Sequence, residues 1–273
     1  INDVTCNNAC DGSVTLQLSG VTNPPYTYQW SNGQTNLTVT GLCAGVHTCS
    51  VTDGVGCVAT KQISIVQPSV LTASIIAQTD VLCNGNNTGN ANVAVNGGTP
   101  NYIYSWSNGQ TNTVANNLIA TTFTVTVTDS HGCTVQTSAA ITEPPILTLT
   151  LTPTDLLCNN ISTGEVTSNV QGGTPNYTYS WNTAATTLTI SSLTIGSYSL
   201  TVTDNNGCTV LASTTITQPS ALSMTLTSTP DHCNQGDGTA YASASGGTGA
   251  YTYSWSNAQN GALVSGLAAN TYT

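Results

Sequence analysis

The sequence has almost no charged side chains, and nearly all of those it has are acidic. One of its 273 residues is Lys or Arg and 11 are Asp or Glu, so the formal net charge is −10 and the charged fraction is 4%. Proteins that bind nucleic acids neutralise phosphates with many basic side chains, so a nucleic-acid partner is excluded. An anionic membrane surface is disfavoured for the same reason.

Long apolar runs and helical periodicity are also missing. Charge-free stretches such as 12–52 are rich in Thr, Ser, Asn and Gln, so none predicts insertion into a membrane. Apolar residues instead alternate with polar or small ones, as Val93 and Val95 do with Asn92 and Asn96. Because β-branched and aromatic residues are plentiful, the sequence predicts an all-β protein.

One sequence pattern, which contains a tryptophan, occurs four times along the chain. "GGTPNYIYSWSNGQ", "GGTPNYTYSWNTAA" and "GGTGAYTYSWSNAQ" begin at residues 97, 172 and 246, and "GVTNPPYTYQWSNGQ" begins at residue 20. The tryptophans of these segments lie 76, 75 and 74 residues apart: Trp30, Trp106, Trp181 and Trp255. This period suits one small β domain per repeat.

Short proline-containing linkers, "VQPSV", "TEPPI" and "TQPSA", divide the chain. Proline cannot continue a strand ladder and stiffens a spacer, so we expect repeats joined in an elongated rod. Repeats 1 to 4 are residues 1–68, 69–144, 145–219 and 220–273. Repeat 1 lacks most of its first strand and repeat 4 stops before its last, so we expect the chain to be a piece of something longer.

Each repeat is predicted to be an immunoglobulin-like β-sandwich of about 75 residues. Short strands separated by turn signals every 8–12 residues, with a tryptophan on a middle strand, favour this fold. Tyr102, Tyr104 and Trp106 fall on one face of their strand. They could form a platform for carbohydrate stacking, but an inward-facing aromatic is more often core, so we expect the four tryptophans to be structural.

A second local pattern supports the sandwich. In every repeat a Leu precedes an aromatic residue or His by five positions, which is typical of a tyrosine corner, where the phenol bonds upstream backbone. Tyr198 and Tyr272 fit the pattern. Phe123 lacks the hydroxyl, and His47 could substitute through a ring nitrogen.

Ten cysteines at regular spacing indicate disulfides and an oxidising compartment. Spacings of 51, 50 and 50 residues predict one bond inside each repeat, namely Cys6–Cys57, Cys83–Cys133 and Cys158–Cys208. Cys10 and Cys43 occur only in repeat 1 and are predicted to form an extra bridge. Cys49 takes an inward position and is expected to be a buried, inert thiol, while Cys233 is expected to be unpaired here.

Carboxylates recur at two places in the repeat, before the first cysteine and after the "VT" strand. Asp80, Asp129, Asp155 and Asp204 are therefore weak candidates for Ca²⁺ ligands, since calcium prefers oxygen donors. The alternative is that each aspartate accepts backbone N–H groups in a turn. No D-x-D-x-D loop is present, and we expect no cofactor. No catalytic residues are expected either, because the histidines form no triad pattern and a catalytic pair copied in every repeat is improbable.

The repeat resembles the SprB-repeat family of gliding Bacteroidota. The resemblance rests on "CNGNNTG", "GGTPNYIYSWSNGQTN", "TFTVTVTDSHGCT" and "ITEPP", with departures at His47, Phe123 and "NTAA". It implies very large adhesins on the cell surface, secreted by the type IX route and moved by the gliding machinery. The family offers no catalytic residues to carry over.

We therefore expect a non-catalytic, extracellular stalk of a large adhesin, including a gliding-motility adhesin. Its partners would be the secretion and gliding machinery, and a surface polysaccharide or solid substrate bound through other parts of the chain. One alternative is a fibre or sheath subunit that self-associates through edge strands of incomplete repeats. Another is a glycan-binding module that uses the tyrosine strand.

Overall fold

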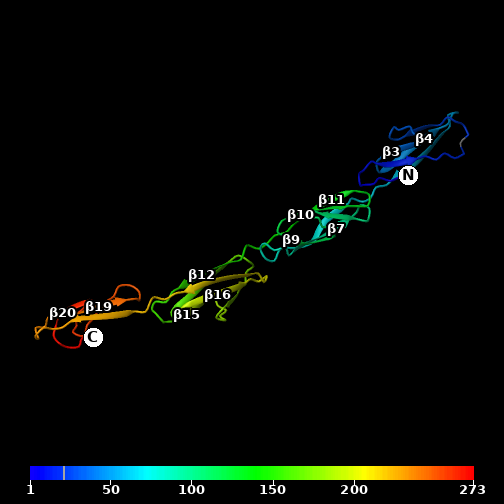
Figure 1. The fold of residues 1–273 in the computed structure, drawn as a ribbon. Helices are drawn as coiled ribbons and strands as arrows, with labels where there is room; N and C mark the ends of the chain where they lie inside the picture. The colour runs from blue at the N-terminus through cyan, green and yellow to red at the C-terminus, as the bar shows by residue number, and fades with distance from the viewer. Residues whose placement is uncertain (21) are drawn as a thin grey trace. The chain divides into compact units, whose positions relative to one another are not determined.

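The alternating segments form antiparallel strands along the whole chain. The computed structural model describes residues 1–20 and 22–273, and its regular secondary structure across these residues consists of strands alone. No helix in this described part has the length and apolar character to span a membrane. The chain divides into two compact units, Ile1–Glu143 and Pro144–Thr273, each holding two of the predicted repeats (Figure 1).

Repeat 2, in the first unit, is a sandwich of two three-stranded antiparallel sheets, ordered β6-β7-β9 and β11-β10-β8. Its strands are β6 (Thr72–Thr79), β7 (Gly89–Asn96), β8 (Ile103–Trp106), β9 (Val114–Leu118), β10 (Thr122–Thr128) and β11 (Thr134–Ala140). The first strand, β6, and the last strand, β11, contact each other. Two antiparallel sheets in this order make the predicted immunoglobulin-like sandwich.

Repeat 1 has the same second sheet, ordered β2-β4-β5, but its first sheet has only β1 and β3. The strands are β1 (Gly12–Thr15), β2 (Thr27–Trp30), β3 (Thr38–Leu42), β4 (Gly45–Thr52) and β5 (Val58–Ile65). Within the described residues of repeat 1 no strand corresponds to β6, as the sequence predicted.

Repeat 3, in the second unit, repeats the arrangement with sheets β12-β13-β15 and β14-β16-β17. Its strands are β12 (Thr148–Thr154), β13 (Gly164–Gln171), β14 (Thr178–Trp181), β15 (Thr189–Leu193), β16 (Gly196–Thr203) and β17 (Thr209–Ile216). Repeat 4 keeps only the first sheet, made of β18 (Ser223–Thr229), β19 (Gly238–Ser245) and β20 (Leu263–Leu267). Around its tryptophan a single bridge, Ser254 to Asn260, is formed.

Each repeat has its own hydrophobic core, centred on the tryptophan. The four tryptophans are 2%, 2%, 3% and 7% exposed in repeats 1 to 4, which confirms their structural role. Inward residues of both sheets pack around them, such as Val93 and Val125 in repeat 2 or Val166 and Leu200 in repeat 3. Every sandwich therefore folds around residues of its own repeat.

Two glycines explain why the "GG" turn follows the second strand of each complete sandwich. Gly97 and Gly172 have φ of 75° and 74°, a region that favours glycine. A Cβ there would lie 2.0 Å from the carbonyl oxygen of Val70 or 1.9 Å from that of Ile146. The turn thus brings its backbone against the start of the sandwich, which only glycine allows.

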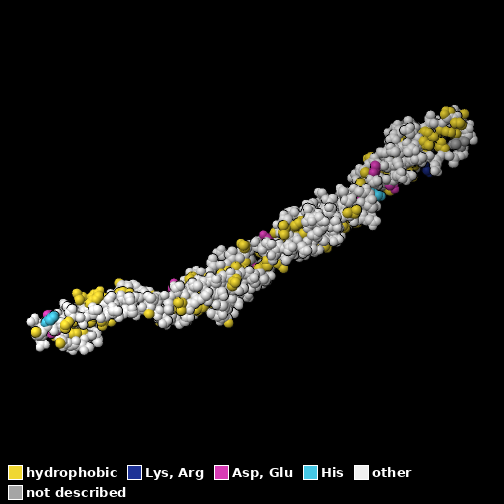
Figure 2. Space-filling view, viewed as in Figure 1, with side chains coloured by type: hydrophobic (Ala, Val, Ile, Leu, Met, Phe, Trp, Pro, Cys, Tyr) yellow, Lys and Arg dark blue, Asp and Glu magenta, His cyan; other side chains and the backbone are white. Residues whose placement is uncertain are grey.

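The surface is mainly polar and uncharged. In the view of Figure 2, charged side chains are few and scattered, and backbone or uncharged polar side chains cover most of what is seen. Apolar side chains such as Val46, Ile103 and Leu211 are exposed among them. Scattered apolar residues are normal on a folded surface.

Candidate functional site

The tryptophan of each repeat uses its only polar group inside the repeat. Each indole Nε1 donates to the backbone oxygen six residues later, at 2.9–3.0 Å: Asn36, Asn112, Thr187 and Gly261. The indole N–H is a donor with no acceptor function, so this bond satisfies it. The same bond holds the turn after the tryptophan strand in place.

The tyrosines beside the tryptophan are also used internally. Tyr102 donates its hydroxyl to the oxygen of Gly97 at 2.7 Å, and Tyr177 donates to Gly172 at 2.6 Å. Tyr104 packs half-buried against the core of repeat 2. The aromatic strand is therefore part of the core. This agrees with the core role expected from the sequence, rather than with a platform for carbohydrate stacking.

The tyrosine corner predicted from the sequence is present. Tyr198 donates to the oxygen of Thr194 at 2.9 Å, and Tyr272 donates to that of Ala268 at 3.1 Å. In repeat 1 the ring Nε2 of His47 takes the same role toward the oxygen of Cys43 at 2.9 Å. Phe123 is buried at this position without a hydroxyl. A ring thus occupies the corner in every repeat, and it makes the hydrogen bond where the residue is Tyr or His.

The aspartate after the "VT" strand is buried and saturated with backbone donors. Asp129 is 3% exposed and accepts N–H groups from Thr99, His131 and Cys133 at 2.9, 3.0 and 2.9 Å. Burial by itself raises its pKa, but the three N–H donors favour the charged form more strongly, so the pKa of Asp129 lies below its ordinary value. Asp204 is in the same environment and its pKa is lowered for the same reasons.

The aspartate before the first cysteine binds the last strand of its repeat. Asp80 accepts the N–H of Thr142 at 2.8 Å, and Asp155 accepts that of Thr217 at 2.7 Å. The Thr217 N–H is the main reason why the pKa of Asp155 is lowered. All four calcium candidates thus accept backbone N–H groups, Asp129 and Asp204 in a turn and Asp80 and Asp155 from a distant segment. Over residues 1–20 and 22–273 no group of three or more His, Cys, Asp or Glu could hold a metal ion.

The three disulfides predicted inside single repeats are wrong. Cys6 of repeat 1 is bonded to Cys133 of repeat 2, with a Cα–Cα distance of 5.8 Å. This bond excludes both Cys6–Cys57 and Cys83–Cys133. Cys158 is a free, exposed thiol, which excludes Cys158–Cys208, and Cys57 is also free and exposed. Cys83 and Cys208 are each in a disulfide.

Strand geometry explains why the predicted bond Cys83–Cys133 and its equivalents cannot form. We call residues 80–88 of repeat 2 and their equivalents the first cysteine turn, and residues 129–133 and their equivalents the second cysteine turn. The first turn precedes β7, whereas the second contacts Thr99, which follows β7. The eight residues of β7 separate the two turns by roughly 25 Å, at about 3.3 Å per residue. A disulfide needs Cα atoms within about 7 Å.

The remaining cysteine predictions are confirmed. Cys10 and Cys43 form a disulfide in repeat 1. Cys49 is a buried free thiol whose pKa is raised by desolvation, and Cys233 is a free thiol at the surface. Oxidation or exchange needs an accessible thiolate, so Cys49 is inert.

The bond between repeats 1 and 2 lies in a small polar junction. The sulfur of Cys133 lies 3.4 Å from the oxygen of Thr5. Asp11 accepts the hydroxyl and, at 3.0 Å, the N–H of Thr5. These two bonds are the main reasons why the pKa of Asp11 is lowered, and a charge on His131 of repeat 2 lowers it further. In the chain-entropy treatment, closing a loop of 127 residues stabilises the folded unit by about 5 kcal/mol.

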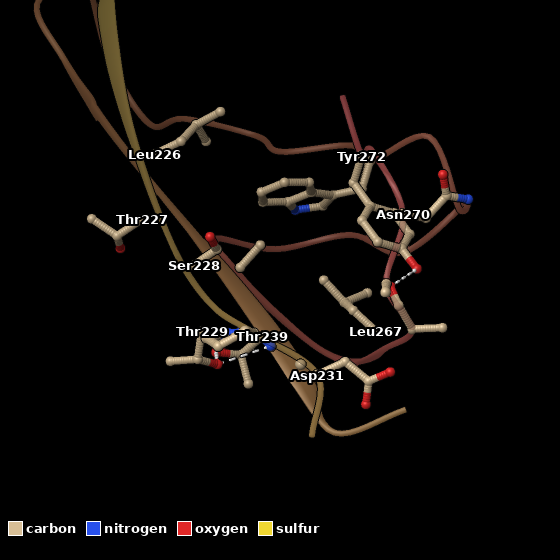
Figure 3. A pocket seen from close by; sticks show the side chains of 15 residues that line it. Leu226, Thr227, Ser228, Thr229, Asp231, Thr239, Leu267, Asn270 and Tyr272 are labelled. Carbon is tan, nitrogen blue, oxygen red and sulfur yellow. Dashed lines mark hydrogen bonds between the residues drawn. The ribbon is translucent and has the colours of Figure 1, made fainter. Parts of the chain in front are cut away.

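The last repeat has an open groove where the complete repeats are closed. In repeats 2 and 3 the last strand places Ile141 or Ile216 over a small residue, because a Cβ on Gly89 or Gly164 would meet that isoleucine at 2.8 Å. At Gly238 no isoleucine is near, and a groove of about 470 Å³ opens (Figure 3). The groove is lined by, among others, Leu226, Ser228, Asp231, Trp255, Leu267 and Tyr272.

Asp231 lies in this groove at a position that is apolar in the other repeats. Val81 and Leu156 fill the corresponding place, directly after the aspartate that binds the last strand, and both are buried. Asp231 accepts the N–H of Gly236 at 2.8 Å through Oδ1, while its Oδ2 is buried without a hydrogen-bond partner. The sequence shows that Asp231 is shifted by one position relative to Asp80 and Asp155, next to a shorter "CNQGDG" loop, but not that the shift places it in a groove.

Repeat 1 has a comparable opening on the side where β6 lies in repeat 2. A cavity of about 530 Å³ runs along β5 and is lined by Leu16, Tyr26, Val51, Val58 and others. Val58 is exposed at the start of β5. The two incomplete repeats thus each present apolar surface at a sheet edge that their complete neighbours cover.

The family profile of the SprB repeat matches the chain four times, at residues 1–35, 75–111, 150–186 and 225–260. These matches cover more than half of the chain, so the protein belongs to the SprB-repeat family, as the sequence motifs indicated. Each match includes the first cysteine turn and ends shortly after the tryptophan. The matched part therefore contains the strand with the tryptophan but not the last strands of the repeat.

Solved immunoglobulin-domain structures resemble the chain only distantly. A structure of the four N-terminal Ig domains of Dscam1 isoform 9.44 has 11% identity and a TM-score of 0.27, covering 70% of this chain and 64% of that one. A complex of Dpr2 Ig1-Ig2 with DIP-Theta Ig1-Ig3 has 10% identity, a TM-score of 0.29, and coverages of 79% and 96%. The chain spans less than two thirds of that Dscam1 chain, and similarity at this level supports no functional argument. No curated protein matches the chain.

Proposed function

We propose that this chain is a non-catalytic section of the repeat stalk of a large secreted adhesin on the cell surface. One observation carries the proposal: the tryptophan, the first tyrosine of the aromatic strand and the recurring aspartates are bonded to the backbone of their own repeat. Trp181, Tyr177 and Asp204 of repeat 3 are examples. A repeat that uses its recurring polar groups in this way serves as a spacer.

Several features support an extracellular place for this stalk. The chain belongs to the SprB-repeat family, contains disulfides, and has one basic side chain. Disulfides persist in oxidising surroundings. Secretion by the type IX route, movement by the gliding machinery, and attachment to a polysaccharide or solid surface through other parts of the chain remain part of the proposal.

Resistance to trypsin and a stable monomer test the stalk. Lys61 is the only trypsin site and lies within β5, opposite Cys49. We expect native protein to stay intact, and Lys61→Gln to remove the one cut made after denaturation. We also expect sedimentation at increasing concentration to show one elongated monomer without affinity for polysaccharide-coated beads. Bead binding that Tyr104→Ala abolishes, with folding intact, would make it a glycan-binding module instead.

The open grooves favour a second candidate, a self-assembling fibre. The groove of repeat 4, which has polar residues such as Ser228 and Asp231 beside Leu226, and the cavity of repeat 1 lie at sheet edges, where a strand of another chain can add. Light scattering distinguishes the two functions, because a fibre grows with protein concentration. Leu226→Lys, which places a charge in the groove, should prevent growth, whereas Leu211→Lys on the exposed face of β17 should not.

A further inference from the structure

The bond Cys6–Cys133 shows a pattern of pairing between repeats that can be compared with the positions of the other cysteines. It joins the first cysteine turn of one repeat to the second cysteine turn of the next. Because the two turns of one repeat lie at opposite ends of its sandwich, a cysteine in one turn cannot bond a cysteine in the other turn of the same repeat. Cys10, in the first turn of repeat 1, bonds Cys43, which lies outside both turns. The three exposed thiols, Cys57, Cys158 and Cys233, all lie in such turns.

A cavity beside Cys158 supplies a second, independent observation. It has a volume of about 640 Å³ and is lined by Leu157 and Cys158 of repeat 3 and by Gly247, Thr248 and other residues of repeat 4. Gly247 and Thr248 of the "GGT" segment in repeat 4 match Gly98 and Thr99 in repeat 2.

In repeat 2 that "GGT" segment seats the second cysteine turn. The N–H of Thr99 binds Asp129 at 2.9 Å, and the oxygen of Thr99 accepts the N–H of Ser130 at 3.2 Å. The turn held there presents Cys133 to Cys6 of the preceding repeat. The two glycines of this segment have similar φ in repeats 2 and 4, 75° and 65° at Gly97 and Gly98 and 79° and 66° at Gly246 and Gly247, so the glycine pair turns the same way in both. The cavity beside Cys158 is therefore a seat for a second cysteine turn.

We propose that a disulfide between a first and a second cysteine turn joins neighbouring repeats as a rule, and that Cys57, Cys158 and Cys233 are half-sites for that bond. The ligand of each is the complementary cysteine turn of an adjoining SprB repeat. Two thiols form one S–S bond and release two protons and two electrons, which reduce an external disulfide to two thiols. The inference does not depend on the proposed stalk function, because it concerns only how repeats are linked.

The test extends the full chain by a copy of residues 200–219, which completes repeat 4 and supplies one new cysteine, the copy of Cys208. Tyr272 and Thr273 align with Tyr198 and Ser199, so the copied segment continues the repeat in register. The protein is equilibrated in a glutathione redox buffer, alkylated without denaturation, digested and analysed by mass spectrometry. We expect the appended cysteine to bond Cys158, while Cys57 and Cys233 remain alkylated.

Two results would overturn the rule. One is a bond between the appended cysteine and Cys233, which lies in the same repeat. The other is an alkylated Cys158 in a buffer in which Cys6–Cys133 is complete. Disulfide-linked dimers through Cys57 and Cys233, increasing with concentration, would instead assign these half-sites to a second copy of the chain.

A substitution in the unextended chain keeps the proposal testable if the extension fails to fold. In Cys6→Ser the rule leaves Cys133 without its partner, so Cys133 should become alkylated while Cys57 stays alkylated as before. A new bond between Cys133 and another cysteine of repeat 2 would contradict the rule. Cys49→Ser is the matched control, because Cys49 is buried and lies outside both turns.

Discussion

Repeats 3 and 4 share one compact unit and almost the same aromatic segment, yet only repeat 3 is closed. In both, the tryptophan bonds the backbone six residues on, and the tyrosine corner is made. Repeat 3 has β17 over its core, whereas repeat 4 has a groove at that place. The hydrogen bonds of the aromatic segment therefore form locally, and the strands of the second sheet decide whether a sandwich results.

The exposure of the first strand differs between the closed repeat 3 and the open repeat 4. In β12, Leu149 and Leu151 are half-buried and pack against the core. In β18, the corresponding Met224 and Leu226 are 59% and 54% exposed. An apolar strand contributes to stability only when a partner removes it from water. Because the chain has several separate cores, predictions about either repeat need a measurement that resolves segments, such as hydrogen exchange with mass spectrometry.

The largest change in stability should come from giving repeat 4 the last strand that repeat 3 has. Adding a copy of residues 200–219 after Thr273, with serine in place of its cysteine, supplies the missing strand. Small domains have stabilities of about 5–15 kcal/mol, so we expect repeat 4 to gain on the order of 5 kcal/mol in the free energy of local opening. Hydrogen exchange in β18 and β19 should slow to the level of β12 and β13. An appended segment with its isoleucine changed to Asp is the control, and equal protection by both would contradict the explanation.

Truncating the tryptophan should separate the closed repeat from the open one. Trp181→Ala removes a buried aromatic from a complete core and should destabilise repeat 3 by about 4 kcal/mol. Trp255→Ala should cost less, because the side chain borders the groove. The comparison fails if hydrogen exchange in β13 and in β19 accelerates equally.

Removing the buried aspartate of repeat 3 should have the next largest effect. Asp204→Ala leaves the N–H groups of Thr174, Asn206 and Cys208 without their acceptor. Losing charge-assisted bonds at a buried site should cost about 3 kcal/mol, measured by local opening of β16 and β17. Asp155→Ala is the control, since Asp155 is exposed and binds one N–H group. A larger loss of stability for Asp155→Ala than for Asp204→Ala would show that burial of the aspartate does not determine the loss.

The tyrosine corner should contribute about one hydrogen bond. Tyr198→Phe keeps the ring and removes the bond to Thr194, so it should destabilise repeat 3 by about 1 kcal/mol. Repeat 2, which has Phe123 at this position, shows that the ring alone permits folding. Tyr272→Phe should cost less in the open repeat 4. No measurable change for Tyr198→Phe in thermal unfolding would mean that the corner acts only by packing.

The smallest effect should be a loss of stability in acid. The pKa of Asp204 is lowered on folding, so its contribution is fully present above the unfolded pKa of about 3.9 and is lost as pH falls through the folded value. Between pH 5 and pH 3, hydrogen exchange corrected for intrinsic rate should show repeat 3 losing protection. Asp204→Asn should remove most of this dependence, and an unchanged acid response would assign it to other carboxylates.

The cysteines show how far the sequence could be interpreted. Regular spacing correctly indicated disulfides, but a spacing of 50 residues says nothing about which end of the sandwich each cysteine occupies. The strand order places the turn with Cys83 and the turn with Cys133 at opposite ends, and this order was available from the alternation pattern. Counting strand directions between cysteines would have predicted bonds between repeats. An open edge in repeat 4 was predictable, because the sequence shows no counterpart of the last strand, whereas the place of Asp231 in the groove depends on how the strands pack.

The sequence by itself determined the repeat, the all-β class, the buried tryptophans and the tyrosine corner. These follow from period-two alternation and from side chains that bond backbone only a few residues away, so local order specifies them. Only the tertiary structure decided that Cys6 bonds Cys133 and that Asp231 lies in an open groove. Both depend on which ends and faces meet after the strands have paired, and residues distant in the sequence set that geometry.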